Sequence, residues 1–173
     1  RVYPWKGIET LIEAAAALVP AGVDVWVAGG TAEEIRLVGG IVDLPHNLRA
    51  AGPRPYQEIP LWLSAADVCV VLGTQKSEYS YYHTSPMKIF EYMAAGKPIV
   101  ASRTPANREI LSEREALFYE PGDPADLAAK IKSVFDHPKE AALRGRAAAK
   151  KVRQWTWEKR ATGVIAHIHR WLL

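Results

Sequence analysis

Apolar residues recur along this chain with two different patterns. Segments with apolar positions spaced by three and four residues are typical of helices with one buried face. They predict helices over residues 6–19, 31–38, 56–66, 105–111, 123–135, 139–153 and 155–172. Short runs that are apolar throughout lie between them. They predict strands over 23–28, 48–52, 67–72, 98–101 and 116–119.

The alternation of helices with continuously apolar strands predicts an α/β fold. A strand without a polar face is buried on both sides, so we expect one Rossmann-like parallel sheet with helices on both faces. Residues 1–173 form a single domain in this interpretation, and residues 1–5 leave the end of a further strand. Ligands of such sheets bind beyond the carboxyl ends of the strands. The loops expected there are 1–6, 29–30, 53–55, 73–85 and 102–105.

The most informative stretch is 85–102, SPMKIFEYMAAGKPIVAS. Ser85 is a candidate N-cap and Pro86 a candidate first helical residue, whereas Gly96 ends the helix before the next strand. The first N–H groups of a helix lack partners and lie at the positive end of its dipole, which favours an anion. Met87 and Lys88, with Ser85, would offer backbone N–H groups to a phosphate.

This stretch resembles the nucleotide-sugar site of retaining glycosyltransferases of family 4, which have the GT-B fold. The resemblance covers nearly the whole chain but only the C-terminal half of such an enzyme. It implies that Glu91 binds the ribose hydroxyls and that Arg1 and Lys6 neutralise the donor diphosphate, so that both cations stabilise the leaving group. It also implies that the turn at Arg54 and Pro55 lines the nucleobase. Independently, Gly29 and Gly30 allow a close approach of backbone to ligand.

His83 departs from the family pattern. The family has two glutamates separated by seven residues, and counting back from Glu91 gives His83 at the first of these places. We assign His83 as a candidate catalytic residue that hydrogen-bonds the sugar or its phosphate; the alternative is a loop histidine without a ligand. Glu78 is a second candidate for the carboxylate.

Composition narrows the class of protein. A chain of 173 residues with 49% hydrophobic residues can bury one proper core. The net charge of +3 suits an anionic ligand, but no basic run or aromatic RNA motif accompanies it, which argues against nucleic acid. Cys69 is the single cysteine and lies within an apolar strand, so we expect a core residue and no disulfide. No metal site and no cofactor are expected beyond a nucleotide-sugar substrate of the UDP or GDP type.

The last segment, 155–172, predicts an amphipathic helix with three tryptophans and a basic face. We expect it to pack against the rest of the fold or, as the resemblance implies, to return to an N-terminal domain. The alternative is peripheral contact with the inner face of a membrane. The chain opens without Met and shows neither a signal peptide nor a transmembrane run, which favours an excised cytoplasmic domain.

Taken together, the resemblance implies the donor-binding domain of a hexosyltransferase. Such an enzyme transfers a sugar, with retention, from a nucleoside diphosphate to an acceptor held by the N-terminal domain. A polysaccharide or glycolipid precursor is the expected acceptor, and the fragment alone is expected to be inactive. A non-catalytic nucleotide-binding or interaction module with the same fold is the alternative, and His83 is the residue that favours it.

Overall fold

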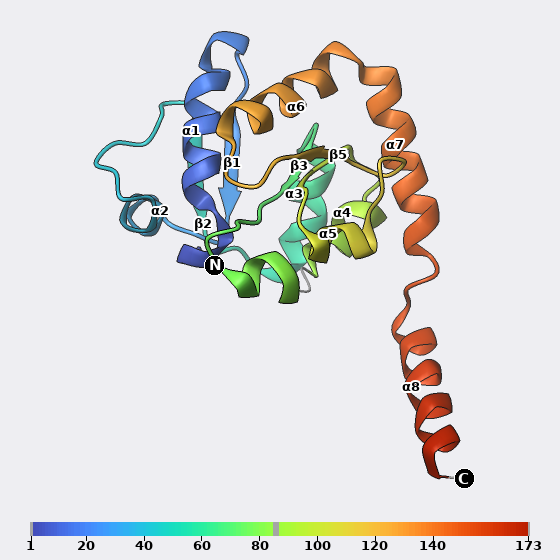
Figure 1. Cartoon of the computed structure of the whole chain (residues 1–173). Coiled ribbons are helices and arrows are strands. Elements are labelled where there is room, and N and C mark those ends of the chain that lie inside the picture. The colour runs from blue at the N-terminus through green and yellow to red at the C-terminus, as the bar shows by residue number, and fades with distance from the viewer. Residues whose placement is uncertain (1, 85–86, 173) are drawn as a thin grey trace.

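The computed structural model describes residues 2–84 and 87–172 and has the predicted α/β order. Helices and strands alternate from the first helix to the last strand, with further helices at the end (Figure 1). The elements are α1 (Ile8–Leu18), β1 (Val25–Ala28), α2 (Ala32–Gly39), β2 (Leu48–Gly52), α3 (Ile59–Ala65), β3 (Cys69–Val71), α4 (Lys88–Ala94), β4 (Ile99–Ser102), α5 (Pro105–Ile110), β5 (Leu117–Tyr119), α6 (Pro124–Asp136), α7 (Pro138–Val152) and α8 (Trp157–Leu172).

The strands form two parallel sheets rather than the single sheet that the sequence predicted. One sheet has the order β1-β2 and the other β3-β4-β5, and every pair is parallel. The apolar runs correctly located the strands, but a run does not encode which strand pairs with which. Among the described residues no ladder joins β1 to β3, because a cavity lined by both strands lies between them.

Helices cover both faces of the three-stranded sheet, as expected. Successive residues of a strand point to opposite faces. In β4, Val100 packs into the cluster formed with α1 and α6, whereas Ile99 and Ala101 pack into the cluster formed with α4 and α7. All four residues of β4 are therefore buried, which explains why its sequence shows no polar alternation.

Two segments differ from the sequence prediction. Residues Pro4–Lys6 form a 3-10 turn where we expected the end of a strand. Residues Tyr79–His83 form one turn of π-helix where we expected an irregular loop. Its residue Ser80 is buried, and the Ser80 hydroxyl accepts a hydrogen bond from the Thr74 backbone N–H at 3.3 Å. The polar, tyrosine-rich composition concealed this turn because it has no apolar period.

Helix α7 crosses the end of α4 at a point where only glycine fits. A Cβ atom added to Gly145 would lie 2.3 Å from the Gly96 carbonyl oxygen, so the two backbones would have to separate. We expect Gly145→Ala to lower the free energy of unfolding by about 2 kcal/mol, because overpacking outweighs the gain in helix propensity of about 1 kcal/mol. Urea denaturation followed by circular dichroism measures this. Gly163→Ala is the matched control, because no atom lies within 4 Å of that Cβ; an equal effect of both substitutions would contradict the prediction.

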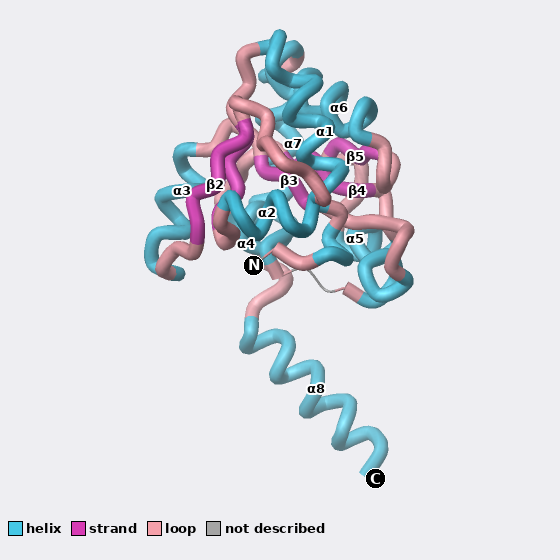
Figure 2. Tube along the Cα trace, turned by 90° about the vertical axis from the view of Figure 1, so that its left-hand side faces the viewer, coloured by secondary structure: helices cyan, strands magenta, loops and turns pink. Residues whose placement is uncertain are grey.

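Helix α8 projects away from the body of the molecule (Figures 1 and 2). Residues 157–171 are all exposed, including the apolar side chains of Trp157, Val164, Ile165, Ile168 and Trp171. The helix therefore does not pack against the rest of the described chain, and its return to an N-terminal domain stays a prediction. Packing stops at Trp155, whose ring meets Phe90 edge-on at 5.6 Å between centroids. Within the described residues, no helix combines the length and the apolarity needed to cross a bilayer.

Candidate functional site

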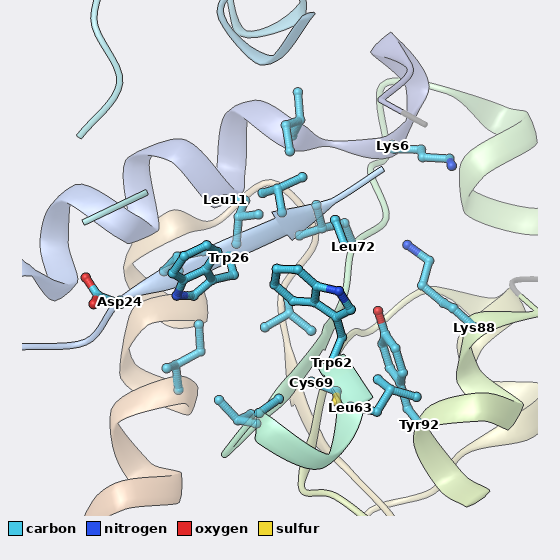
Figure 3. A pocket seen from close by; sticks show the side chains of 18 of the residues that line it. Lys6, Leu11, Asp24, Trp26, Trp62, Leu63, Cys69, Leu72, Lys88 and Tyr92 are labelled. Carbon is cyan, nitrogen blue, oxygen red and sulfur yellow. The ribbon is translucent and has the colours of Figure 1, made fainter. Parts of the chain in front are cut away.

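Lys6 and Lys88 come together at one cavity although 82 positions separate them in the sequence. Lys6 ends the 3-10 turn before α1, and Lys88 is the first residue of α4. Figure 3 shows their side chains reaching into the same space from opposite sides. The cavity has a volume of about 270 Å³. Two ammonium groups at one opening make it attractive to an anion.

The pKa of the Lys88 ammonium reflects its burial close to Lys6. The pKa of the Lys88 ammonium is lowered to about 8, first by burial and then by the nearby Lys6 charge, whereas Glu91 acts in the opposite direction. Lys6 also lies over the Tyr3 ring, with Nζ 4.9 Å from the centroid. A cation held in partly buried surroundings beside a second cation costs free energy. A bound anion would remove that cost.

Glu91 lies three residues after Lys88, so α4 carries both an ammonium and a carboxylate within one turn. Its side chain lines a groove between α3 and α4 together with Tyr56, Leu63 and Lys97. Lys97 closes this groove, because its Nζ donates to the Ser64 carbonyl oxygen at 2.7 Å. The cation-lined cavity and the Glu91 groove therefore lie on adjoining sides of one short helix.

The sequence reasoning overlooked two aromatic residues that line the cavity, Trp62 and Tyr92 (Figure 3). Burial raises the pKa of the Tyr92 phenol above its ordinary value, and the neighbouring Cys69 and Glu91 act in the same direction. Tyr92 follows Lys88 by four residues, and this helical spacing could have placed it on the same face. The position of Trp62 depends on how α3 meets the strands, for which the sequence carries no signal.

Gly29 and Gly30 follow β1, as predicted. Other residues of the protein, Gly52 and Val2, lie directly against them. The Gly29 N–H donates to the Gly52 carbonyl at 2.8 Å, and the Gly52 N–H donates to the Gly30 carbonyl at 3.0 Å. A Cβ atom on Gly30 would lie 2.3 Å from Cγ2 of Val2. Contact of these glycines with a ligand stays a prediction.

Arg54 and Pro55 lie in the turn after β2, outside the cavity. The Arg54 Nε donates to the Ala51 carbonyl at 2.8 Å, and the guanidinium lies 5.6 Å from the centroid of the Trp62 ring. Pro55 is exposed. Arg54 thus packs on the far side of a residue that lines the cavity, and a role at a nucleobase stays a prediction.

Three further predicted residues, Met87, His83 and Glu78, are not among those that line the cavity. Met87 is the N-cap of α4 and, with Phe90, lines a groove beside Trp155. His83 ends the π-helical turn and is exposed, with its ring centroid 6.1 Å from that of Tyr82. Glu78 is exposed just before that turn. The roles proposed for these three residues stay predictions.

Arg1, Ser85 and Pro86 fall outside the described residues, so the capped helix start that we predicted is not described. Helix α4 begins at Lys88. Cys69 is buried, and burial raises the pKa of its thiol to about 11, with Lys97 opposing the shift. Its thiol is therefore protonated near neutral pH, as expected of a core residue. Within residues 2–84 and 87–172, no group of three or more His, Cys, Asp or Glu side chains is arranged to hold a metal ion.

The sequence was compared with protein families and with individual proteins of known function. The model of the family "Glycosyl transferases group 1" matches residues 1–137. D-inositol 3-phosphate glycosyltransferase of Arthrobacter sp. (strain FB24) is 26% identical over 98% of this chain and 41% of its own length.

Two solved structures share the fold. Sucrose-phosphate synthase from Thermosynechococcus elongatus has a TM-score of 0.76 at 27% identity, over 97% of this chain and 42% of that one. Anabaena HepE, solved in complex with UDP and glucose, has a TM-score of 0.75 at 22% identity, over 98% of this chain and 46% of that one. The chain thus spans about two fifths of the length of the curated relatives it matches.

Proposed function

The chain belongs to the group 1 glycosyl transferases, and on that basis we propose that it is the donor-binding, C-terminal domain of a retaining hexosyltransferase. The donor is a nucleoside-diphosphate sugar of the UDP or GDP type. The acceptor, a polysaccharide or glycolipid precursor, binds mainly to an N-terminal domain of the same full-length protein. The complex of HepE with UDP and glucose supports this class of donor.

The observation that carries the proposal is the convergence of Lys6 and Lys88 at one cavity, with Glu91 one turn further along α4. In our proposal the two ammonium groups bind the diphosphate. Glu91 accepts hydrogen bonds from the ribose hydroxyls, which are worth about 1.5–3 kcal/mol each when the acceptor is charged. Negative charge grows on the diphosphate as the glycosidic bond breaks, so the lysines bind the transition state more tightly than the ground state. Cations from the protein then perform the charge neutralisation.

A second candidate is a non-catalytic nucleotide-binding module. His83 favours it, because a histidine stands where the family has its first glutamate. Sugar transfer by the full-length protein distinguishes the two candidates, since both bind nucleotide but only the enzyme releases a nucleoside diphosphate. Transfer that survives in a His83→Ala variant would assign the donor-sugar contact to another residue, with Glu78 the first to examine.

Nucleotide binding tests the proposed site directly. Calorimetric titration of the chain with UDP, GDP and ADP should show binding of one diphosphate. Glu91→Ala should weaken that binding at least tenfold, about 1.4 kcal/mol or more, through the loss of the ribose hydrogen bonds. Glu13→Ala is the matched control, because Glu13 is exposed on α1 away from both openings.

The titration distinguishes the ribose role of Glu91 from the donor-site proposal as a whole. Binding that is unchanged in Glu91→Ala would remove the ribose role of Glu91. If no diphosphate binds to the folded chain, the titration is repeated with the full-length protein, where binding would assign part of the affinity to the other half. Failure there as well would contradict the donor-site proposal.

A further inference from the structure

The π-helical turn Tyr79–His83 presents aromatic rings to solvent close to Lys6. The side chains of Tyr79 and Tyr82 are 59% and 54% exposed. This turn contacts the 3-10 turn Pro4–Lys6, and Figure 1 shows it as the green helical turn beside the label N. The tyrosines of the turn are not among the described residues that line the cavity. An aromatic surface therefore lies just outside the opening at which we propose that the diphosphate binds.

Hydrogen bonds hold this turn in one conformation. The Tyr81 N–H donates to the Ser77 carbonyl at 3.0 Å, and the Thr84 hydroxyl donates to the Tyr79 carbonyl at 2.9 Å. Ser80 is buried beneath the turn, which packs against α5. Rings on such a turn are positioned before a ligand arrives, so that binding orders few side chains. Single turns of π-helix also occur frequently at functional sites.

The rings of the turn leave most of their faces uncovered. Tyr81 and Tyr82 meet edge-on, with 4.7 Å between the ring centroids and an interplanar angle of 87°. Tyr82 and His83 are tilted at 47° with 6.1 Å between the centroids. An edge-on pair covers at most one face of one ring, so other ring faces are free to stack on a ligand.

The composition of the segment 73–84, GTQKSEYSYYHT, indicates the chemistry of that ligand. It contains no Val, Leu, Ile, Met or Phe, so the apolar surface of the turn consists of tyrosine rings surrounded by polar side chains. A pyranose ring is complementary to such a surface. Its C–H face stacks on the negative face of an aromatic ring, and its hydroxyls bond to polar groups at the edge. A lipid surface would favour Leu, Phe and Trp instead.

We propose that the π-helical turn Tyr79–His83 binds pyranose rings of a carbohydrate acceptor, with Tyr79 and Tyr82 as the stacking residues. This inference rests on the proposed function and assigns part of the acceptor site to this domain. The donor has its sugar attached to the diphosphate, which we place between Lys6 and Lys88. The exposed tyrosine rings lie outside that cavity, where they offer surface to a further sugar. The acceptor class is therefore an oligosaccharide or polysaccharide.

Binding of the full-length protein to an array of immobilised oligosaccharides, without nucleotide, tests this proposal. The wild type should bind a subset of them. Tyr79→Ala and Tyr82→Ala should each weaken that binding roughly tenfold, whereas Tyr82→Phe should retain it because the ring face remains. Phe135→Ala is the matched control, because Phe135 is an exposed aromatic residue near the end of α6. Circular dichroism of each variant verifies that it is folded.

Two outcomes on the array would overturn the proposal. One is the absence of binding to any oligosaccharide, and the other is equal binding by the wild type and both alanine variants. The second would also be expected if another part of the full-length protein covered the turn. Oligosaccharide binding that is lost in both alanine variants and kept in Tyr82→Phe and Phe135→Ala supports the proposal.

Titration with UDP and UDP-glucose, or with the corresponding GDP pair, distinguishes acceptor from donor sugar. The ratio of the two affinities should be the same in Tyr82→Ala and in the wild type. A selective loss of affinity for the nucleotide sugar, with oligosaccharide binding intact, would assign Tyr82 to the donor sugar and overturn the proposal. The array contains no nucleotide, so its result is independent of the proposed donor site. A protein that binds oligosaccharide through these tyrosines but binds no diphosphate would retain this site and lose the proposed function.

Discussion

Replacing Lys88 by Met is expected to make the ligand-free protein more stable and to weaken its binding of a nucleoside diphosphate at least about a hundredfold. The pKa of the Lys88 ammonium is lowered from 10.5 to about 8, first by burial and then by Lys6. At about 1.36 kcal/mol per pKa unit, keeping this group charged near pH 7 costs up to about 3 kcal/mol. Methionine has a similar length and no charge, so the free energy of unfolding should rise by about 1–3 kcal/mol.

The pH dependence of stability identifies the cause. Between about pH 8 and 10.5 the unfolded chain binds more protons at this lysine than the folded chain does, so the wild type gains stability as the pH rises through that window. The Lys88→Met variant should lack this rise. Urea denaturation of the wild type and the variant at pH 7 and pH 9.5 measures the gain in stability and its pH dependence. A variant that is less stable than the wild type at pH 7 would contradict the prediction.

Diphosphate binding should change in the opposite sense. We expect a loss of at least about a hundredfold, or 2.7 kcal/mol, because one of two charge-assisted contacts disappears. Arg146→Met is the control, since Arg146 is an exposed cation within α7 that lines neither opening. A variant that gains stability and keeps full affinity would place the diphosphate elsewhere. The site would then have to be sought near Met87 or His83.

The sequence best predicted the features that depend on residues close to one another in the chain. β4 was predicted at residues 98–101 and is observed at Ile99–Ser102, because burial on both faces leaves a continuous apolar run. The helix predicted over 56–66 is observed as α3, which begins at Ile59 with Pro60 in its first turn. These features depend on neighbours a few residues away, and such neighbours are visible in the sequence.

The candidate site was only partly predictable. Lys6 was assigned from a family resemblance and Lys88 from a helix start, and neither argument indicated that the Lys6 charge lowers the pKa of Lys88. Their meeting depends on the close approach of Gly7 to Gly73 and on the packing of α4. Such contacts join segments far apart in the chain, for which a single sequence carries no periodic signal.

The same limit applies to the sheet and to the last helix. The apolar runs predicted five strands but not the separation of β1 from β3. The amphipathic pattern of 155–172 predicted α8 but not what covers its apolar side. A hydrophobic pattern indicates that one face of a helix or strand is buried in the functional protein. It does not indicate which other surface covers that face.

Diphosphate binding should depend on pH, because Lys88 is only partly protonated above pH 8 in the ligand-free protein. A bound diphosphate favours the charged form and raises its pKa, so binding above pH 8 takes up a proton. The dissociation constant should be nearly constant between about pH 7 and 7.5 and should rise roughly tenfold by about pH 9. Titration calorimetry at pH 8 in two buffers of different ionisation enthalpy should show uptake of about half a proton.

Lys88→Arg separates this cause from a general effect of alkali on the protein. An arginine stays charged over the whole range, so the variant should bind with little pH dependence and without proton uptake, even if its affinity is lower. A slope that persists in Lys88→Arg would assign the titration to a group other than Lys88. A flat profile in the wild type would mean that the Lys88 ammonium is not the group that meets the diphosphate, because a cation whose pKa is about 8 cannot bind an anion there without proton linkage.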